Sequence, residues 1–204
     1  MSPGADVLEL RRWRPGDGPA VAAVFEAALR DAGAFYPEAG SPDEEDPRSD
    51  YVDAGGEFLV GVVDDAASGP ASTAGGDDGG TLPDDLRGAD GTLVATGAIR
   101  PPADAVHARF GGVAGLDGSE PAELKRMHVH PAFHRRGFGG RLFGELVERA
   151  RRRGYDALVL ETTDRQEAAL SFYRERGFAE AARRTVAVGD GERLDVVSLW
   201  TRLG

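Results

Sequence analysis

The chain has 204 residues and a formal net charge of −11, because 24 Lys and Arg oppose 35 Asp and Glu. This length suits one domain of ordinary size, and a hydrophobic content of 41% excludes wholesale disorder. Cysteine is absent, which excludes disulfides, thiolate metal sites and cysteine nucleophiles. No apolar run approaches the length of about 18 residues that a membrane span needs. The first residues do not resemble a signal peptide, so a cytoplasmic protein is expected.

The acidic charge is concentrated in one part of the chain. Residues 38–90 contain 15 acidic and two basic residues, whereas the other 151 positions contain 20 acidic and 22 basic ones. An acidic chain is expected to bind nucleic acid poorly. The basic residues are 23 arginines and one lysine, Lys125. This composition favours a protein adapted to a high-salt cytoplasm, and a codon bias toward arginine explains it as well.

The first elements follow from hydrophobic spacing. A strand is predicted over residues 7–13, and a helix follows whose apolar residues recur at three- and four-residue intervals. Asp17 is the expected N-cap of this helix and Gly33 its end. A short helix is expected at 48–52, and the β-branched residues of 57–63 predict a second strand.

The middle of the chain is dominated by loops. Residues 64–91 contain almost no large apolar side chain and are predicted to form a flexible acidic loop. Strand-like residues resume at 92–99, so the loop is interpreted as an elongated hairpin connection. A second loop is expected at about 103–120, before a strand at 122–129.

The last part of the chain alternates more regularly. A helix with one apolar stripe begins after Gly137, and a buried strand is predicted at 156–161. A second helix ends at Gly177, and two closing strands are expected at 185–188 and 195–200. The predicted order is strand, helix, three strands, helix, strand, helix and two strands.

The segment 129–142 carries the clearest chemical signal. A strand ends there, a glycine-rich basic turn follows, and a helix begins. Unpaired N–H groups and the positive end of a helix favour anions, and Arg135 and Arg136 offer charge-assisted hydrogen bonds. Residues 125–153 contain nine basic and two acidic residues, although 149–153 are interpreted as a solvated helix end. The segment therefore predicts a ligand that carries phosphate.

Two common phosphate-binding motifs do not fit this turn. A Walker P-loop requires a Gly-Lys-Ser/Thr ending that the chain lacks. A dinucleotide fingerprint requires a third glycine three residues after the second. Gly137 and Gly139 fill its first two places, but Leu142 occupies the third.

Two motifs resemble those of the GNAT N-acetyltransferase superfamily. Residues 134–139 read His-Arg-Arg-Gly-Phe-Gly, similar to the family's Gln/Arg-x-x-Gly-x-Gly/Ala with histidine in the first place. Residues 166–178 match the family's Asn-x-x-Ala-x-x-x-Tyr-x-x-x-Gly-Phe, with Gln166 in the asparagine place. The two motifs and their spacing cover about residues 122–180.

The resemblance implies an α/β acyl-CoA N-acyltransferase fold. Its sheet would be mixed, mostly antiparallel and twisted, with six or seven strands flanked by about four helices. The chain would form a single domain over 1–204. The strands at 122–129 and 156–161 would splay apart and hold acetyl-CoA between them. Members of the family are often dimers, which allows a homodimer, but the sequence alone does not reveal the oligomeric state.

The same resemblance implies the residues that hold acetyl-CoA. The strand before the first motif, the basic turn and the second-motif helix would each supply contacts. The implied contacts are Met127, His128, Val129, His134, Arg135, Arg136, Gly137, Phe138, Gly139, Gly140, Gln166, Ala169 and Tyr173.

The family's mechanism is direct attack of an amine on the thioester, without an acyl-enzyme. The resemblance implies that a backbone N–H near residues 127–129 holds the oxygen of the tetrahedral intermediate. Tyr173, at the family's tyrosine position, would protonate the departing thiolate. The acceptor would be a primary amine on a small molecule, a protein N-terminus or a lysine. A non-catalytic acyl-CoA-binding or regulatory module of the same fold is the alternative.

A general base is also needed, and Glu123 is the candidate. By the two-residue period of a strand it shares a face with Lys125, Met127 and Val129. A solvated strand carboxylate is an equally good interpretation of Glu123, and a core position is the plain interpretation of Tyr173.

Three histidines raise the question of a metal site. His128, His130 and His134 lie close in the sequence, but no cysteine or carboxylate completes a familiar ligand spacing. No metal is expected.

Overall fold

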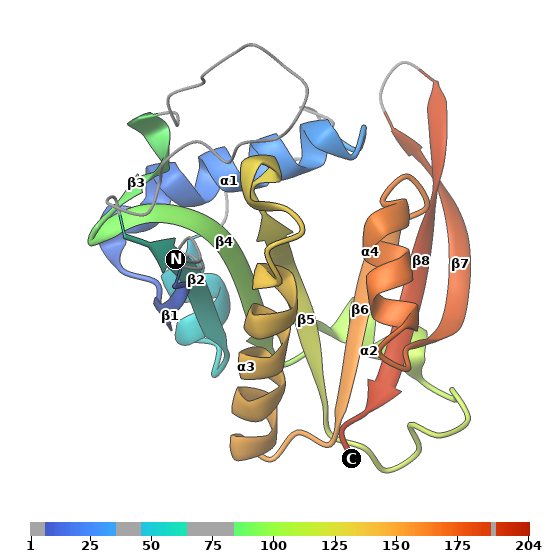
Figure 1. Cartoon of the computed structure of the whole chain (residues 1–204). Helices are drawn as coiled ribbons and strands as arrows, with labels where there is room; N and C mark the ends of the chain where they lie inside the picture. Colours follow the sequence, from blue (N-terminus) through green and yellow to red (C-terminus); the bar gives the residue numbers. More distant parts are fainter. Residues whose placement is uncertain (1–6, 36–45, 65–83, 189–190) are drawn as a thin grey trace.

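The molecule is built on a single twisted sheet (Figure 1). The computed structural model describes residues 7–35, 46–64, 84–188 and 191–204. The strands are β1 (Glu9–Arg12), β2 (Glu57–Val63), β3 (Arg87–Gly88), β4 (Gly91–Arg100), β5 (Pro121–Val129), β6 (Ala157–Thr163), β7 (Ala179–Val188) and β8 (Glu192–Arg202). The eight-stranded sheet has the order β1-β2-β4-β5-β6-β8-β7, with β3 paired to β4 off this path. Among the strands of the described residues, β5 and β6 form the only parallel pair.

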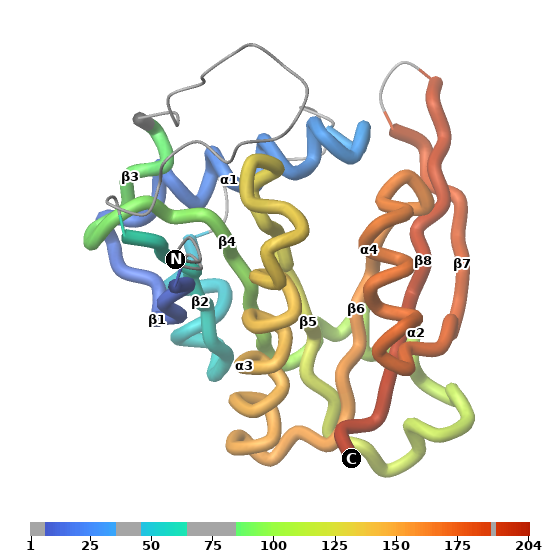
Figure 2. Tube along the Cα trace, viewed as in Figure 1, coloured from blue at the N-terminus to red at the C-terminus, as the bar shows by residue number. Residues whose placement is uncertain are grey.

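Helices cover both faces of the sheet (Figure 2). They are α1 (Gly18–Asp31), α2 (Asp104–Phe110), α3 (Phe138–Arg152) and α4 (Glu167–Arg174), with short helical turns η1 (Pro15–Asp17), η4 (Arg48–Val52), η6 (Asp84–Leu86) and η7 (Pro131–Phe133). Helices α3 and α4 pack on one face, and α1 and α2 on the other. The predicted fold class is confirmed. Within the described ranges, no helix is long and apolar enough to span a bilayer.

The two faces have separate apolar cores. On one face, Leu142 and Leu146 of α3 are fully buried in the same cluster as Leu124 of β5. On the other, Val24 of α1 is buried in a cluster with Val60 of β2. Burial of such side chains on both faces fixes the sheet between two helical layers.

Some predicted elements are longer or more ordered than expected. The loop predicted at 103–120 contains α2, whose Val106 and Phe110 are buried four residues apart. A helix of this length is too short to give a clear periodic signal. The short strand β3 lies in the described end of the predicted 64–91 loop, whose residues 65–83 lie outside the described ranges. The two closing strands are also longer than predicted.

Asp17 is the N-cap residue of α1, as predicted, but its side chain makes no capping hydrogen bond to the helix. Its carboxylate is completely buried and accepts two hydrogen bonds from the Arg11 guanidinium, at 2.7 and 2.8 Å. The backbone N–H groups of Arg14 and Ala89 donate to the same carboxylate. Burial acts to raise the pKa of Asp17, but these donors outweigh it and hold the pKa below its usual value. Asp17 therefore ties β1 to the β3–β4 turn.

Strand β5 contains one extra residue relative to β4. Thr96 pairs with His128, but Ala98 pairs with Lys125. An interval of two residues on β4 therefore lies opposite an interval of three residues on β5. Arg126 has a left-handed backbone, with φ of 55°. This arrangement is a β-bulge, which bends a strand and increases its twist.

The bulge also changes which face each β5 side chain occupies. Leu124 and Met127 both belong to the core beneath α3, although they are three positions apart in the strand. The guanidinium of Arg126 instead lies 4.6 Å from the Phe25 ring of α1. Alternation places Glu123 on the face opposite Leu124. The prediction that Glu123 shares a face with Met127 is therefore wrong, because the extra residue reverses the alternation.

The arginines at the end of α3 are not simply solvated, which corrects the sequence interpretation. Arg149 and Arg153 donate to the buried carboxylate of Glu57 on β2, as does Arg12 of β1. The side chain of Arg149 is only 18% exposed. Burial alone would raise the pKa of Glu57, but the three guanidinium groups lower it from 4.5 to about 2. This cluster fastens the C-terminal end of α3 to β1 and β2.

The Glu57 cluster makes stability depend on acid pH. Because the folded-state pKa lies below the ordinary value, Glu57 stabilises the fold above pH 4.5 and loses this effect as the pH falls toward about 2. The effect at neutral pH amounts to about 3 kcal/mol. Glu57→Gln should therefore lower the free energy of unfolding, measured with urea at pH 7. Between pH 4.5 and about 2, the free energy of unfolding of this variant should change less with pH than that of wild type. Glu148→Gln, an exposed carboxylate of α3 paired with Arg151, is the control. If the free energy of unfolding changes equally with pH in wild type and in Glu57→Gln, Glu57 does not have this role.

Gly56 permits a close approach of β2 to the end of β4. A Cβ added there would lie 2.1 Å from the carbonyl oxygen of Ile99 and 2.8 Å from the Cα of Arg100. Because both atoms are backbone, Gly56→Ala should lower the free energy of unfolding by about 2 kcal/mol or more. Gly144→Ala is the control, since a Cβ there meets nothing within 4 Å and alanine favours a helix interior by about 0.5–1 kcal/mol. A Gly56→Ala protein as stable as wild type would exclude this contact.

Candidate active site

The site begins where β5 and β6 separate. Residues 121–123 pair with residues 157–159 in parallel, and the pairing ends at Glu123 and Val159. Both strands continue past this point, β5 to Val129 and β6 to Thr163, and they diverge toward the loop before α3 (Figures 1 and 2). Backbone groups along these inner edges therefore lack the strand partner that they have elsewhere in the sheet. An extended ligand with amide groups can pair with such an edge.

The turn between β5 and α3 lies at the open end of this gap. After η7, Arg135 and Gly137 both have left-handed backbones, with φ of 61° and 79°. Helix α3 then begins at Phe138, without a side-chain cap at Gly137. The first N–H groups of an α-helix have no intrahelical partner, and the helix dipole adds positive potential there. This turn, called the cradle below, thus has a geometry that suits an anion.

His134 fastens the cradle to the end of β5. Its Nε2 lies 2.9 Å from the carbonyl oxygen of Val129, and its Nδ1 lies 3.9 Å from a carboxylate oxygen of Asp31. The side chain therefore positions the turn, in addition to any backbone contribution at this motif position.

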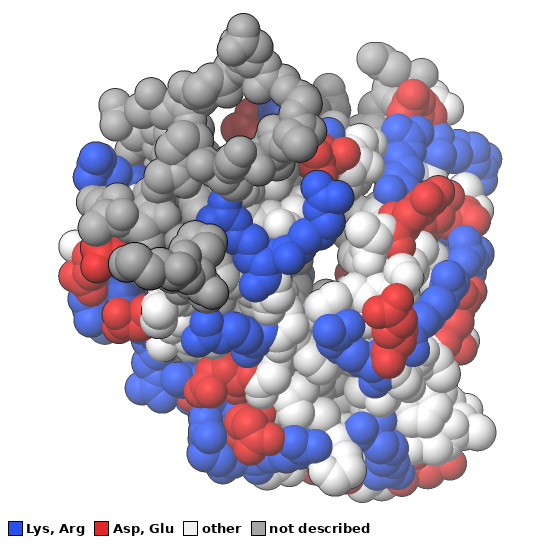
Figure 3. Space-filling model, in the orientation of Figure 1, with Lys and Arg blue, Asp and Glu red and all other residues white. Residues whose placement is uncertain are grey.

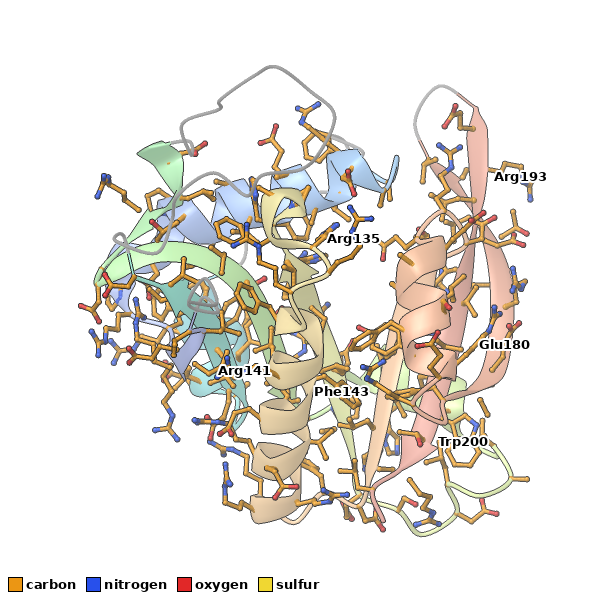
Figure 4. The ribbon with its side chains drawn as sticks, viewed as in Figure 1. Arg135, Arg141, Phe143, Glu180, Arg193 and Trp200 are labelled. Carbon is orange, nitrogen blue, oxygen red and sulfur yellow. The ribbon has the colours of Figure 1, made fainter. Side chains whose placement is uncertain are left out.

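Most basic residues of 125–153 lie toward one end or the other of α3, whereas Lys125 and Arg126 lie on β5. Those at the end of the helix bind carboxylates, as Arg149 does. Near the cradle, the Arg136 guanidinium lies 4.7 Å from the Phe133 ring and donates to the carbonyl of Ala132. Figure 4 shows Arg135 projecting from the turn over the space between α3 and α4. Figure 3 shows Lys and Arg side chains beside a hollow on this same face.

Helix α4 forms the other side of the gap. A Cβ added to Gly139 would lie 3.7 Å from Val129 of β5 and 3.8 Å from the Phe172 ring of α4. The first turn of α3 is thus close to both neighbours, and a larger side chain at Gly139 would fill the space between them. Gln166 lies at the start of α4, where its Oε1 accepts a hydrogen bond from Thr162 at 2.7 Å.

Tyr173 lies on the inner side of α4. The residue is 6% exposed, and its ring contacts those of Phe172 and Phe178. Burial raises the pKa of the Tyr173 phenol above its usual value, and nearby Arg176 opposes this only in part. Within the part of the chain that the structure describes, no hydrogen bond of this hydroxyl is found. A neutral phenol in this environment can donate its proton.

Glu123 lies at the vertex of the gap, as the last β5 residue paired with β6. It is 4% exposed, and its Oε2 accepts a hydrogen bond of 2.9 Å from Arg100 of β4. Glu123 faces the α1 side of the sheet, whereas Tyr173 belongs to the core beneath α3 and α4. The two candidate catalytic side chains thus lie on opposite faces, one on each side of the gap.

A small pocket lies on the α1 side of the bulge. It is lined by Val21, Phe25, Pro47, Tyr51, Phe58, Thr96 and Arg126. Thr96 donates from Oγ1 to the carbonyl of Arg126, at 2.8 Å, and so holds the bulged residue in place. Burial, assisted by the charge of Arg126, lowers the pKa of nearby His128 to about 3, so this histidine stays neutral.

The model of the acetyltransferase (GNAT) family matches residues 23–178. The chain belongs to this family. Solved structures show the same fold. A GNAT-superfamily phosphinothricin acetyltransferase of Sinorhizobium meliloti, in complex with acetyl-CoA, superposes with a TM-score of 0.65 at 17% identity, covering 97% of this chain and 89% of that one. The yncA structure of Salmonella typhimurium, with its cofactor acetyl-CoA, gives a TM-score of 0.63 at 17% identity over 97% and 94% of the two chains.

Sequence relatives share shorter stretches. The L-methionine sulfoximine/L-methionine sulfone acetyltransferase of Salmonella typhimurium is 29% identical over 98 residues, which cover 48% of this chain and 57% of that protein. The matched stretches span 38% to 57% of the length of the curated relatives.

The structure of this GNAT-family chain brings the two motifs together. Residues 134–140 surround the open end of the gap, and Phe172 of the second motif lies beside Gly139. Ala169 packs against the core under α4, together with Met127 and Val129 of β5. Among the described residues, no group of three histidine or acidic side chains is placed to hold a metal ion.

Sequence reasoning missed three residues that shape the site. Thr96 holds the bulge, and Arg100 holds Glu123. Arg176 lies beside Tyr173 and the start of α3. Strand periodicity shows which side of β4 a residue occupies, but not what it meets on another strand, so the sequence had no signal for these contacts.

Proposed function

We propose that this chain transfers the acetyl group of acetyl-CoA directly to a primary amine of a small molecule, a protein N-terminus or a lysine. One observation carries the proposal: the anion cradle of α3 lies at the open end of an unpaired β5 edge. Acetyl-CoA combines phosphates with an extended arm that contains two amides, and this arrangement can accommodate both. Family membership and the acetyl-CoA complexes of structures with the same fold support the proposal.

The ligand would lie along the gap. The N–H groups of residues 135–140 would hold the diphosphate, assisted by Arg135 and Arg136. Backbone groups of residues 127–129 would pair with the pantetheine arm, although the Val129 carbonyl already contacts His134. Gln166 and Ala169 would contact the arm from α4.

The reaction would take place in the gap, with Tyr173 on one face of the sheet and Glu123 on the other. The neutral amine attacks the thioester carbonyl, so that a C–N bond forms while a backbone N–H near residues 127–129 stabilises the oxygen. The C–S bond then breaks, and Tyr173 protonates the thiolate. Glu123 would accept the ammonium proton through water. Its position at the vertex, on the face opposite Tyr173, separates the acid from the base.

The organisation of the chain is part of the proposal. We propose one acetyltransferase domain over residues 1–204, in a cytoplasmic protein that forms a homodimer. The lysine-poor acidic surface would keep this protein soluble at high salt.

The direct assay measures the CoA thiol that is released when the protein is incubated with acetyl-CoA and an amine. The chain has no cysteine, so a thiol reagent reports only the CoA that is produced. A suitable panel contains methionine sulfone, phosphinothricin, simple amines, and peptides with a free N-terminal alanine or an internal lysine. If the protein binds acetyl-CoA but releases no CoA with any amine of the panel, the non-catalytic alternative is favoured.

Tyr173→Phe should lower kcat by about 100-fold or more, because general acids contribute factors of about 10²–10⁴. The KM for acetyl-CoA should stay within about threefold, since ring packing is retained. Tyr155→Phe is the matched control, as Tyr155 is a partly buried tyrosine that packs against the same core. A kcat for Tyr173→Phe equal to that of the control would remove Tyr173 from the mechanism.

Charge reversal tests the cradle. Arg136→Glu should weaken CoA binding more than tenfold in a calorimetric titration, because it places a negative charge beside the diphosphate. Arg152→Glu makes the same charge change at the other end of α3, where the side chain is 61% exposed, and should have little effect. Unchanged CoA affinity for Arg136→Glu would exclude this placement of the phosphates.

A further inference from the structure

Arg176 lies outside the signature positions of both motifs, between Tyr173 and Gly177. Its side chain turns back along α4, where Nη1 donates a 2.8 Å hydrogen bond to the carbonyl of Phe172. The guanidinium carbon lies 3.5 Å from the centre of the Phe172 ring. This stacking and the hydrogen bond hold a long side chain in one orientation, so little entropy remains to be lost when it binds a ligand.

The held guanidinium reaches across to α3. Its Nη2 lies 3.5 Å from the position that a Cβ on Gly140 would occupy, and its carbon lies 5.7 Å from the Phe143 ring. Gly140 is in the first turn of α3, whose N–H groups form the cradle. Arg176 therefore places a positive charge on the α4 side of the cradle, opposite the turn that carries Arg135.

Arg176 differs from its neighbours in its charge partners. Arg174, two residues earlier, lies 3.6 Å from Glu180, and Arg183 also pairs with Glu180. No carboxylate of the described residues lies within 4.0 Å of the Arg176 guanidinium. Nη1 is used by the Phe172 carbonyl, and the Nη2 edge faces the cradle. A fixed, uncompensated guanidinium edge suits a phosphate, which accepts paired charge-assisted hydrogen bonds.

We propose that Arg176 binds a phosphate group of CoA from the α4 side of the gap, opposite the N–H groups at the start of α3. The inference rests on the proposed function and adds a phosphate ligand that neither motif specifies. CoA carries a diphosphate and a 3′-phosphate, which offer the same chemistry to a guanidinium.

The test compares two arginines of the same segment. Arg176→Gln should weaken the binding of CoA about tenfold or more in a calorimetric titration, whereas Arg174→Gln should bind within about twofold of wild type. Repeating the titrations with 3′-dephospho-CoA identifies the phosphate. A loss that persists with 3′-dephospho-CoA assigns Arg176 to the diphosphate, and a loss seen only with CoA assigns it to the 3′-phosphate. CoA affinity for Arg176→Gln equal to that of Arg174→Gln overturns the inference.

An acetyl donor without phosphates distinguishes phosphate binding by Arg176 from a role of Arg176 in packing. In steady-state assays with a fixed amine, Arg176→Gln should raise the KM for acetyl-CoA and leave kcat/KM for S-acetylpantetheine unchanged. Equal losses with both donors would mean that Arg176 only supports the packing of α3 on α4, and would overturn the inference. If wild type transfers acetyl from neither donor, the proposed reaction fails, but the CoA titrations still decide the role of Arg176.

Discussion

The extra residue in β5 determines the form of the whole site. Around Arg126, the strand contains one more residue than the paired segment of β4. Arg126 has a left-handed backbone, and the hydroxyl of Thr96 donates a hydrogen bond to its carbonyl. A bulge bends a strand and increases its twist, and β5 pairs with β6 only up to Glu123, before the bulge. The same extra residue directs Arg126 toward α1 and returns Met127 to the α3 face. One local irregularity therefore decides which β5 side chains face α1 and which face α3.

The electrostatics of α3 follow from its two ends. At the C-terminal end, Arg149 and Arg153 pair with the buried carboxylate of Glu57, which anchors the helix to β1 and β2. At the N-terminal end, the N–H groups lack intrahelical partners, and Arg135 and Arg136 lie nearby. The net charge of −11 therefore does not prevent phosphate binding. Much of the acidic charge lies in residues 38–90, and one end of α3 remains positive.

Local sequence patterns predicted the order of the main elements other than β3 and α2, and the place of the glycine-rich turn before α3. Glycines such as Gly137, the periodic stripe of α3 and the β-branched residues of β2 act within a few residues, so they can be recognised without the fold. The sequence could not show the partners of Glu57 or the bulge at Arg126, because both depend on pairing between distant segments. The face assigned to Glu123 was wrong for this reason: alternation holds only while two strands advance in step.

We propose that the divergence of β5 from β6 creates the binding site for the acyl donor. A crystal structure of the protein with CoA is the decisive measurement. We expect the pantetheine arm to lie between the two strands, paired with the β5 edge beyond Glu123, and the diphosphate to lie against the N–H groups of residues 135–140. CoA bound elsewhere, or a β6 strand that closes onto β5 and leaves no room for the arm, would contradict this proposal.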